Sequence, residues 1–244
     1  SEANVLAWRN IMKIGIICAM DEETDYLLSK LTKYTTKEIG PFKFFEGETE
    51  DGKEVVVSRS GIGKAKAAAD TALLISTFNV NYVINSGIAG SMSKELKIND
   101  IVFSTSVSYH DADFTPFGYK IGQMAGEEAV FNASPEMIAK AEIAASTIPN
   151  LKDHIKKGLI ISGDQFINTP EMKEEILKNF PQAMVTECEG APIAQIASSF
   201  KIPFIIIRSV SDSADEQETG TYDFNVKSAS ENSAKLVLAM IKML

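Results

Sequence analysis

Two apolar runs limit the folds that this chain can adopt. Residues 13–19 read K-I-G-I-I-C-A, and residues 204–210 are apolar except for Arg208 and Ser209. A strand that is covered on one face alternates polar and apolar side chains, whereas a strand that is covered on both faces is apolar throughout. Both runs are therefore predicted to be strands of a sheet that has helices on each side.

The rest of the chain predicts strands and helices in alternation. An Asp51-Gly52 turn between residues 42–49 and 55–60 indicates a hairpin. Further strands are predicted at 82–85, 101–107, 157–162 and 183–185, and helices at 21–32, 65–77, 135–147, 170–179, 190–200 and 223–243. No linker divides residues 12–244, and residues 1–11 are interpreted as a leader or an expression remnant. The predicted fold is a single-domain, three-layer α/β/α sandwich around a central mixed, largely parallel sheet.

In such sheets, ligands bind beyond the carboxyl ends of the strands, and several of these ends carry glycine, carboxylate or aromatic residues. They are Met20 with Glu23, S-G-I-G-K at 60–64, S-G-I-A-G at 86–90, G-D-Q-F-I at 163–167, and Ser211 with Asp212. The two glycine-rich motifs are interpreted as tight turns that let a ligand approach the backbone. By itself, Phe166 fits a core position as well as a ligand contact, and Asp212 fits a helix cap as well as a catalytic acid.

Residues 184–192 (M-V-T-E-C-E-G-A-P) carry two carboxylates, Glu187 and Glu189, on either side of Cys188. If the backbone is still extended there, both carboxylates lie on one face of the strand. Two like charges at this spacing need a cationic or hydroxyl-bearing group opposite them. The diol of a sugar would meet that need. The alternative is a solvated strand end with surface acids.

Composition argues against several functional classes. The net charge is −9 and the basic residues are scattered, which argues against a nucleic-acid groove or an anionic membrane surface. The two cysteines, Cys18 and Cys188, fit a reducing compartment, so we expect a cytoplasmic protein. His110 and His154 have no metal-ligand spacing, so no metal site is expected.

The segment 109–127 is irregular and rich in aromatic residues. Irregular segments of this length in a compact domain are usually functional or lie at an interface, so we expect one of these roles here.

Seven motifs, in the same order along residues 12–244, resemble the 5′-methylthioadenosine/S-adenosylhomocysteine nucleosidase family of the nucleoside phosphorylase superfamily. They are I-G-I-I-C-A-M-D-E-E at 14–23, S-G-I-G-K at 60–64, N-S-G-I-A-G at 85–90, Y-H-D-A-D at 109–113, G-D-Q-F-I at 163–167, E-C-E-G-A at 187–191 and R-S-V-S-D at 208–212. The resemblance implies hydrolysis of the N-glycosidic bond of 5′-methylthioadenosine and S-adenosylhomocysteine, with 5′-deoxyadenosine as a third candidate substrate. It also implies that neither a metal nor an organic cofactor takes part.

The resemblance assigns roles by position. Glu23 is implied to activate the attacking water, Asp212 to protonate the purine at N7, and Glu189 to accept hydrogen bonds from the ribose hydroxyls. These roles agree with the chemistry, because adenine leaves poorly as an anion and a carboxylate stabilises the oxocarbenium-like sugar. The implied substrate-binding residues are Phe166 and Ile167 at the base, Ile88 and Arg208 near the ribose and water, Met20 and Ile62 at the 5′-alkylthio group, together with Glu187, Cys188, Ser211 and Tyr222. Phe117 is implied to reach the pocket of a neighbouring subunit, so a homodimer is expected.

Two positions depart from the family pattern. Cys188 stands where the family usually has methionine, and Tyr222 where it usually has phenylalanine. Neither change removes an acid or a base, so they bear on substrate preference and efficiency. The preference among 5′-thioadenosines and futalosine-type substrates depends on the shape of an apolar pocket.

Three alternatives stay open at this point. A nucleoside phosphorylase would use phosphate in place of water, but Asp21, Glu22 and Glu23 at the end of the first strand would repel that anion. A non-catalytic nucleoside-binding protein would have no use for the Glu23–Asp212 pair. A purely assembling protein would leave the polar groups that converge on one pocket unexplained.

Overall fold

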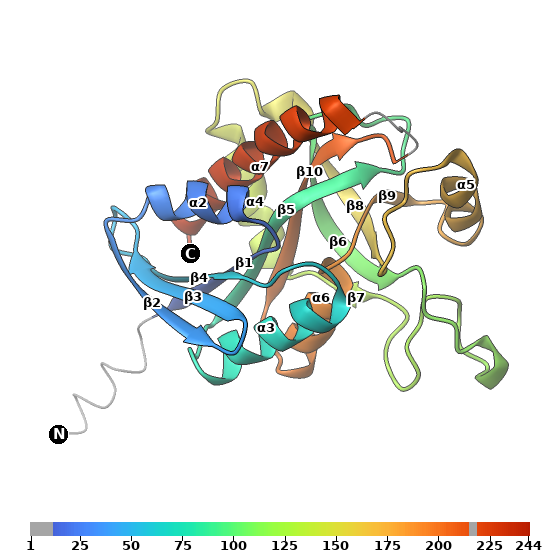
Figure 1. The fold of residues 1–244 in the computed structure, drawn as a ribbon, viewed down its shortest axis with the longest axis horizontal. Coiled ribbons are helices and arrows are strands. Elements are labelled where there is room, and N and C mark those ends of the chain that lie inside the picture. Colours follow the sequence, from blue (N-terminus) through green and yellow to red (C-terminus); the bar gives the residue numbers. More distant parts are fainter. Residues whose placement is uncertain (1–11, 215–218) are drawn as a thin grey trace.

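The structure, a computed structural model, describes residues 12–214 and 219–244, with the backbone alone for 219–224 (Figure 1). The strands are β1 Lys13–Cys18, β2 Lys33–Ile39, β3 Phe42–Glu48, β4 Glu54–Arg59, β5 Tyr82–Ser91, β6 Ile101–Tyr109, β7 Phe131–Asn132, β8 Ile155–Ser162, β9 Ala183–Glu187 and β10 Phe204–Asp212. The helices are α2 Asp21–Ser29, α3 Lys64–Ser76, α4 Pro135–Ser146, α5 Pro170–Asn179, α6 Gly190–Ser199 and α7 Thr219–Ile241, with short 3-10 turns η1 Thr115–Phe117 and η2 Lys152–His154.

Within the described residues, the strands form one mixed, ten-stranded sheet in the order β10-β6-β8-β9-β5-β1-β4-β3-β2, with β7 paired to β6. The two apolar runs are β1 and β10, as predicted, and each pairs in parallel with β5. Strand β10 also pairs antiparallel with β6, so that β5, β10, β6, β8 and β9 close into a circuit. Antiparallel β5 and β9 overlap at their carboxyl ends, where Gly90 pairs with Thr186. The chemistry-bearing strand ends therefore converge even though the strands run in both directions.

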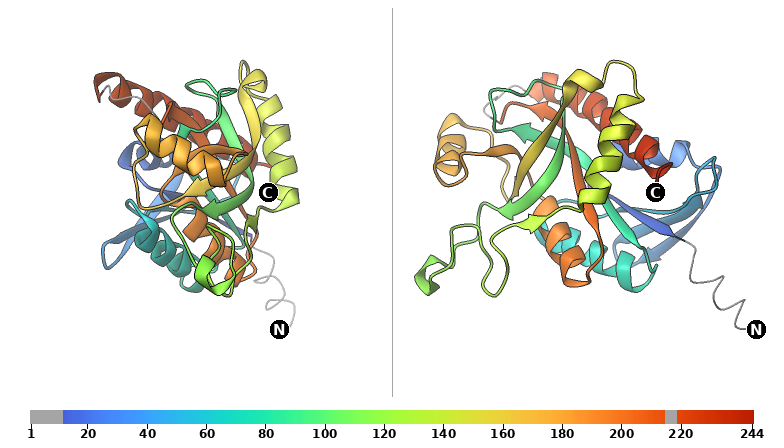
Figure 2. Two further views of the ribbon diagram at one scale, coloured as in Figure 1. Left: turned by 90° about the vertical axis from the view of Figure 1, so that its right-hand side faces the viewer. Right: turned by 180° about the vertical axis from the view of Figure 1, so that it is seen from behind.

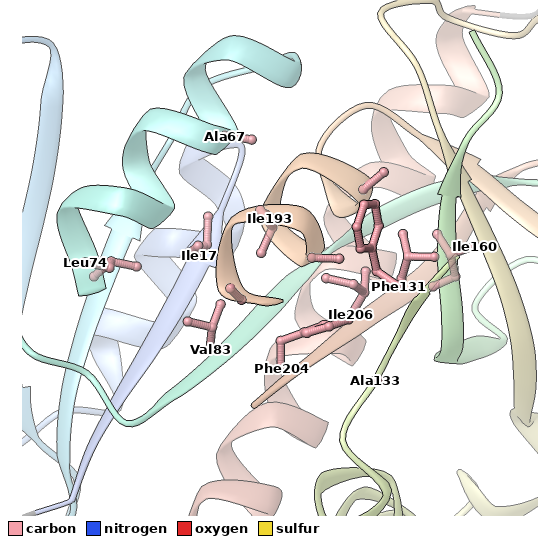
Figure 3. Close-up of a cluster of buried hydrophobic side chains, with 14 of the residues drawn as sticks. Ile17, Ala67, Leu74, Val83, Phe131, Ala133, Ile160, Ile193, Phe204 and Ile206 are labelled. Carbon is pink, nitrogen blue, oxygen red and sulfur yellow. The ribbon is translucent and has the colours of Figure 1, made fainter. Parts of the chain in front are cut away.

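Helices cover both faces of this sheet, which confirms the predicted α/β/α layers (Figure 2). Helices α3 and α6 pack on one face against residues such as Ile17, Val83 and Ile206 (Figure 3). Helices α2, α4 and α7 pack on the other face against residues such as Ile16 and Ile84. Neighbouring residues of one strand thus enter opposite cores, which explains why the strands carry no polar alternation.

Two features differ from the sequence prediction. Strand β2 was not expected, because it is polar and mostly exposed at the edge of the sheet and so has no apolar periodicity. The predicted turn at residues 86–90 is wrong, because β5 continues through it to Ser91. The glycines serve close approach instead: a Cβ on Gly87 would lie 2.7 Å from Nη1 of Arg208, and one on Gly90 would lie 2.9 Å from Oδ1 of Asp212.

The segment 109–127 is irregular apart from the end of β6 and η1, as predicted, and it projects from the body of the molecule (green, lower right in Figure 1). Within the ranges that the structure describes, we find no helix of the length and apolar character required to cross a membrane.

Candidate active site

A cavity of about 130 Å³ lies at the convergence of the strand ends. Eleven of the predicted site residues line it: Met20, Glu23, Ile62, Ile88, Phe166, Glu187, Cys188, Glu189, Arg208, Ser211 and Asp212. A smaller adjoining cavity of about 40 Å³ shares part of this lining and adds Gln165 and Ile167. Residues from β1, β4, β5, β8, β9 and β10 or the segments that follow them thus surround one space.

The charged floor of the cavity is organised by Arg208, which is almost completely buried on β10. Its guanidinium donates to Oδ1 of Asn85 at 2.6 and 3.0 Å and to the carbonyl of Ile88 at 2.9 Å. It forms an ion pair with Glu187 at 2.6 Å and a longer one with Glu189 at 3.5 Å. Of the two kinds of group that the sequence left open opposite these acids, cationic or hydroxyl-bearing, the protein itself supplies the cation as Arg208.

The two acids have different surroundings. Strand β9 ends at Glu187, and Glu189 is the N-cap residue of α6 with φ −124° and ψ −27°, so the extended geometry assumed from the sequence does not continue. Glu187 accepts hydrogen bonds from the hydroxyl of Ser162 and from the backbone N–H of Gly190, in addition to its pairing with Arg208. Its oxygens are thus engaged by protein donors.

Glu189 is held by the turn that contains Gly63. The N–H of Gly63 donates to Oε2 of Glu189 at 3.0 Å, and Gly63 has φ +101°, a conformation that side-chain-bearing residues rarely adopt. Burial raises the pKa of Glu189 despite the opposing effect of Arg208. This carboxylate is poised to gain from hydrogen-bond donors such as hydroxyls brought by a ligand.

Glu23 lies in the first turn of α2 and is 1% exposed. Its Oε2 accepts a hydrogen bond from the N–H of Ala19 at 3.3 Å, while its Oε1 has no hydrogen-bond partner among the described residues. Burial, followed by the nearby charge of Glu189, raises the pKa of Glu23 to about 8, although Arg208 opposes the shift. An acid with this pKa can exchange a proton near neutral pH.

Asp212 ends β10 and is also buried. Its Oδ1 accepts a hydrogen bond from the N–H of Ala214 at 2.8 Å, and its Oδ2 lies 3.0 Å from the hydroxyl of Ser211. The carboxylate is therefore fixed in orientation at the cavity.

Three loops at the rim are tied together by Lys64, Asp111 and Asp164. Lys64 Nζ lies 3.0 and 2.9 Å from the two carboxylate oxygens of Asp111, and the N–H of Asp164 donates to Asp111 at 3.0 Å. The N–H of Lys64 in turn donates to Asp164 at 2.8 Å. These bonds connect motifs 60–64, 109–113 and 163–167. They hold Ile62 and Phe166, which are 68% and 58% exposed, over the cavity.

Cys188 is a free thiol whose Sγ lies 3.6 Å from the carbonyl of Gln165. Burial and the adjacent charges of Glu189 and Glu187 raise the pKa of Cys188 to about 12, so the thiol is neutral. It contributes a compact, weakly polar wall to both cavities.

One predicted site residue, Phe117, is not brought to the cavity, and the side chain of another, Tyr222, is not described. Phe117 is 79% exposed on the projecting segment and lines neither cavity. Tyr222 lies outside the described residues, since only its backbone in α7 is described. Sequence reasoning also missed Asn85, Ser162 and Thr186, whose polar side chains sit inside apolar strands. A buried serine, threonine or asparagine in such a run is the signal that could have pointed to them.

The arrangement brings the buried carboxyl groups of Glu23, Asp212 and Glu189 to one cavity, with Glu189 beside Arg208. It can transfer protons and stabilise positive charge on a bound ligand. Throughout residues 12–214 and the described part of α7, no cluster of three or more histidine, cysteine or acidic side chains is placed to hold a metal ion.

Known proteins are similar over the full length of the described fold. The sequence profile of the phosphorylase superfamily matches residues 13–242. A 5′-methylthioadenosine/S-adenosylhomocysteine nucleosidase of Psychromonas ingrahamii is 45% identical over 233 residues, which cover 96% of this chain and 100% of that protein. Its counterpart in an Exiguobacterium species is 42% identical over 233 residues, which cover 96% of this chain and 99% of that protein.

Solved structures give the same result. The Neisseria meningitidis 5′-methylthioadenosine/S-adenosylhomocysteine nucleosidase in complex with methylthio-immucillin-A matches with a TM-score of 0.92 and 40% identity, covering 95% of this chain and 99% of that chain. The futalosine hydrolase of Helicobacter pylori strain 26695 matches with a TM-score of 0.88 and 33% identity, covering 96% of this chain and 99% of that chain. This chain therefore belongs to the phosphorylase superfamily and, within it, to the 5′-methylthioadenosine/S-adenosylhomocysteine nucleosidase family, and it is an N-glycosyl hydrolase.

Proposed function

We propose that this protein hydrolyses the N-glycosidic bond of 5′-methylthioadenosine and S-adenosylhomocysteine and releases adenine. The observation that carries the proposal is one cavity lined by Glu23, Glu189 and Asp212, with apolar residues at its rim. The carboxylates suit a ribose and a purine, and the apolar rim suits a thioether. The names of the relatives support the same substrates.

In this proposal, Asp212 protonates the purine at N7 as the glycosidic bond lengthens. Glu189 accepts hydrogen bonds from the ribose hydroxyls and gains energy as positive charge develops on the sugar. Glu23 takes a proton from the attacking water through Oε1, the oxygen that has no partner among the described residues. Because each carboxylate has one task, no further group is needed for the proton transfers.

Water rather than phosphate is the proposed nucleophile. The acidic and basic residues that line the cavity in the described part of the chain are Glu23, Glu187, Glu189, Asp212 and Arg208. Arg208 is already paired with Glu187 and Glu189, so a phosphate ion would meet an excess of negative charge without a free cation.

We expect the purified protein to release adenine from 5′-methylthioadenosine in phosphate-free buffer, with 5-methylthioribose as the second product. The reaction should be followed by chromatography across a panel that includes S-adenosylhomocysteine, 5′-deoxyadenosine and a futalosine-type nucleoside. Phosphate should not accelerate the reaction. A strict requirement for phosphate, with a sugar 1-phosphate as product, would establish the phosphorylase alternative.

We further propose a homodimer in which Phe117 reaches the 5′-thio end of the neighbouring subunit's cavity. The support is the resemblance to the family, together with an apolar side chain that is 79% exposed on a projecting segment. The free thiols Cys18 and Cys188 support action in the reducing cytoplasm.

Phe117→Ala is expected to raise KM for 5′-methylthioadenosine about tenfold, because a buried aromatic contact of ~1.5 kcal/mol is lost. The kcat should change much less. Light scattering of the wild type should give the mass of a dimer. Phe200→Ala removes another exposed phenylalanine, at the end of α6, and should leave KM unchanged. A monomeric wild type, or equal effects of the two variants, would contradict the assignment of Phe117.

A further inference from the structure

Thr186 carries a buried hydroxyl that the proposed mechanism does not use. The residue lies on β9 and is 6% exposed, and its Oγ1 has no hydrogen-bond partner in the described part of the chain. Leaving such a group unpaired costs stability, whereas valine would fill the same volume without that cost. We therefore expect this hydroxyl to find its hydrogen-bond partner on a bound ligand, which is absent from the ligand-free protein.

The pairing of β9 with β5 fixes the direction of the Thr186 side chain. Thr186 lies opposite Gly90 in the antiparallel ladder, and side chains of directly opposed residues project from the same face. A Cβ on Gly90 would lie 2.9 Å from Oδ1 of Asp212. The side chain of Thr186 therefore projects to the face of the sheet on which the carboxylate of Asp212 lies.

Thr186 lines both the main cavity and the smaller adjoining one. The smaller cavity includes Asp212, Gln165 and Ile167, but its lining lacks Glu23, Glu189 and Arg208. It is thus the end of the site whose lining includes the proposed acid for the purine but not the carboxylate proposed to bind the ribose. A ligand group that meets Thr186 there belongs to the base.

We propose that the hydroxyl of Thr186 hydrogen-bonds the polar edge of the bound purine and so acts as a specificity-determining residue. A hydroxyl can donate to a ring nitrogen or accept from an exocyclic amine, both of which adenine presents. The bond satisfies a group that is otherwise buried and unpaired, so it favours purines that offer a partner at this position. The inference rests on the proposed function, because it takes the base of that substrate as the ligand.

The test compares Thr186→Val with Thr186→Ser by calorimetric titration with free adenine. Thr186→Val should weaken adenine binding about three- to tenfold, the worth of one neutral hydrogen bond, while the ligand-free variant unfolds at the same or a higher temperature. Thr186→Ser keeps the hydroxyl and should bind adenine like the wild type. Ser230→Ala is the matched control, because Ser230 on α7 also has a buried hydroxyl without a described partner but lines neither cavity. It should leave adenine affinity unchanged.

Equal affinities of the valine and serine variants would overturn the inference, whether both match the wild type or both are weakened. A second arm uses 1-deazaadenine, 3-deazaadenine and purine, each of which lacks one polar group of adenine. The loss of affinity caused by Thr186→Val should disappear for one of these three ligands. A loss that persists with all three would also overturn the inference. If the wild type binds no adenine and cleaves no 5′-thioadenosine, the proposed function itself fails, which is a separate outcome.

Discussion

Glu23→Gln is expected to lower the rate of adenine release by about 10²–10⁴-fold, the usual contribution of a general base. Glutamine keeps the shape and the hydrogen bond from Ala19 but cannot accept the proton of the attacking water. In the wild type, Glu23 must first lose its own proton, and its pKa is about 8. The kcat/KM of the wild type should therefore rise with pH up to about 8, whereas the residual activity of the variant should lack this rise.

The same substitution should increase stability at alkaline pH. The unfolded chain releases the Glu23 proton near the ordinary pKa of 4.5, whereas the folded protein retains it up to about 8. Between these values the folded state binds more protons than the unfolded state, so the stability of the wild type falls as pH rises. Glu23→Gln removes this loss, and above pH 8 it should unfold with a free energy greater by an amount on the order of a few kcal/mol.

The control for this prediction is Glu22→Gln. Glu22 is the neighbouring residue in the first turn of α2, but it is exposed. Its substitution should leave both the rate and the pH dependence of stability nearly unchanged. The proposed role of Glu23 would be refuted by a Glu23→Gln variant that retains wild-type turnover. A variant that still binds adenosine analogues but turns none over would exclude the non-catalytic alternative.

Much of the fold and the site could be predicted because the pattern of apolar and polar residues in this sequence indicates which of them are buried. The apolar runs that became β1 and β10 fixed a sheet covered on both faces, and polar residues directly after the strands located the cavity. The acids at 187 and 189 also predicted a cationic or hydroxyl-bearing group opposite them, and the structure places the cation Arg208 there. Each of these inferences rests on the unfavourable free energy that the residue would have without the cover or the partner that the fold provides.

The features that sequence reasoning missed depend on tertiary contacts. Glycine usually marks a turn, so Gly87 and Gly90 predicted one, but they are part of β5 and make room for Arg208 and Asp212. Strand β2 is polar because it is an edge strand, and only its partner β3 determines its conformation. Thr186 resembles any threonine in a strand until its cross-strand neighbour and its unpaired hydroxyl are known.

Arg208 lines the site and also connects the strands and acids that form it. It connects Asn85 and Ile88 of β5 with the acids at the end of β9, and it does so from β10. Burial of the two acids without this cation would be costly, because their charges are nearly removed from water. The stability of this acid cluster therefore depends largely on the positive charge of Arg208.

Arg208→Met is accordingly expected to lower the free energy of unfolding by about 3–5 kcal/mol at neutral pH, as is typical when one partner of a buried ion pair is removed. Methionine fills part of the volume but leaves Glu187 and Glu189 without their cation. Loss of Arg208 removes the influence that opposes the raised pKa of Glu189, so that pKa should rise further. The folded variant then retains a proton that the unfolded chain releases, and its stability should fall more steeply with rising pH than that of the wild type.

Urea denaturation followed by circular dichroism over a range of pH measures this effect, and two further variants make it specific. Arg59→Met breaks an ion pair with Asp21 in which both side chains are exposed, and it should cost less than about 1 kcal/mol. Adding Glu187→Gln to Arg208→Met removes one of the two uncompensated charges and should recover part of the lost stability. If Arg208→Met lowered the free energy of unfolding as little as Arg59→Met, the buried cluster would not depend on its cation. If the double variant recovered nothing, the loss would stem from packing rather than from charge, because only the electrostatic cost is relieved when Glu187 becomes neutral.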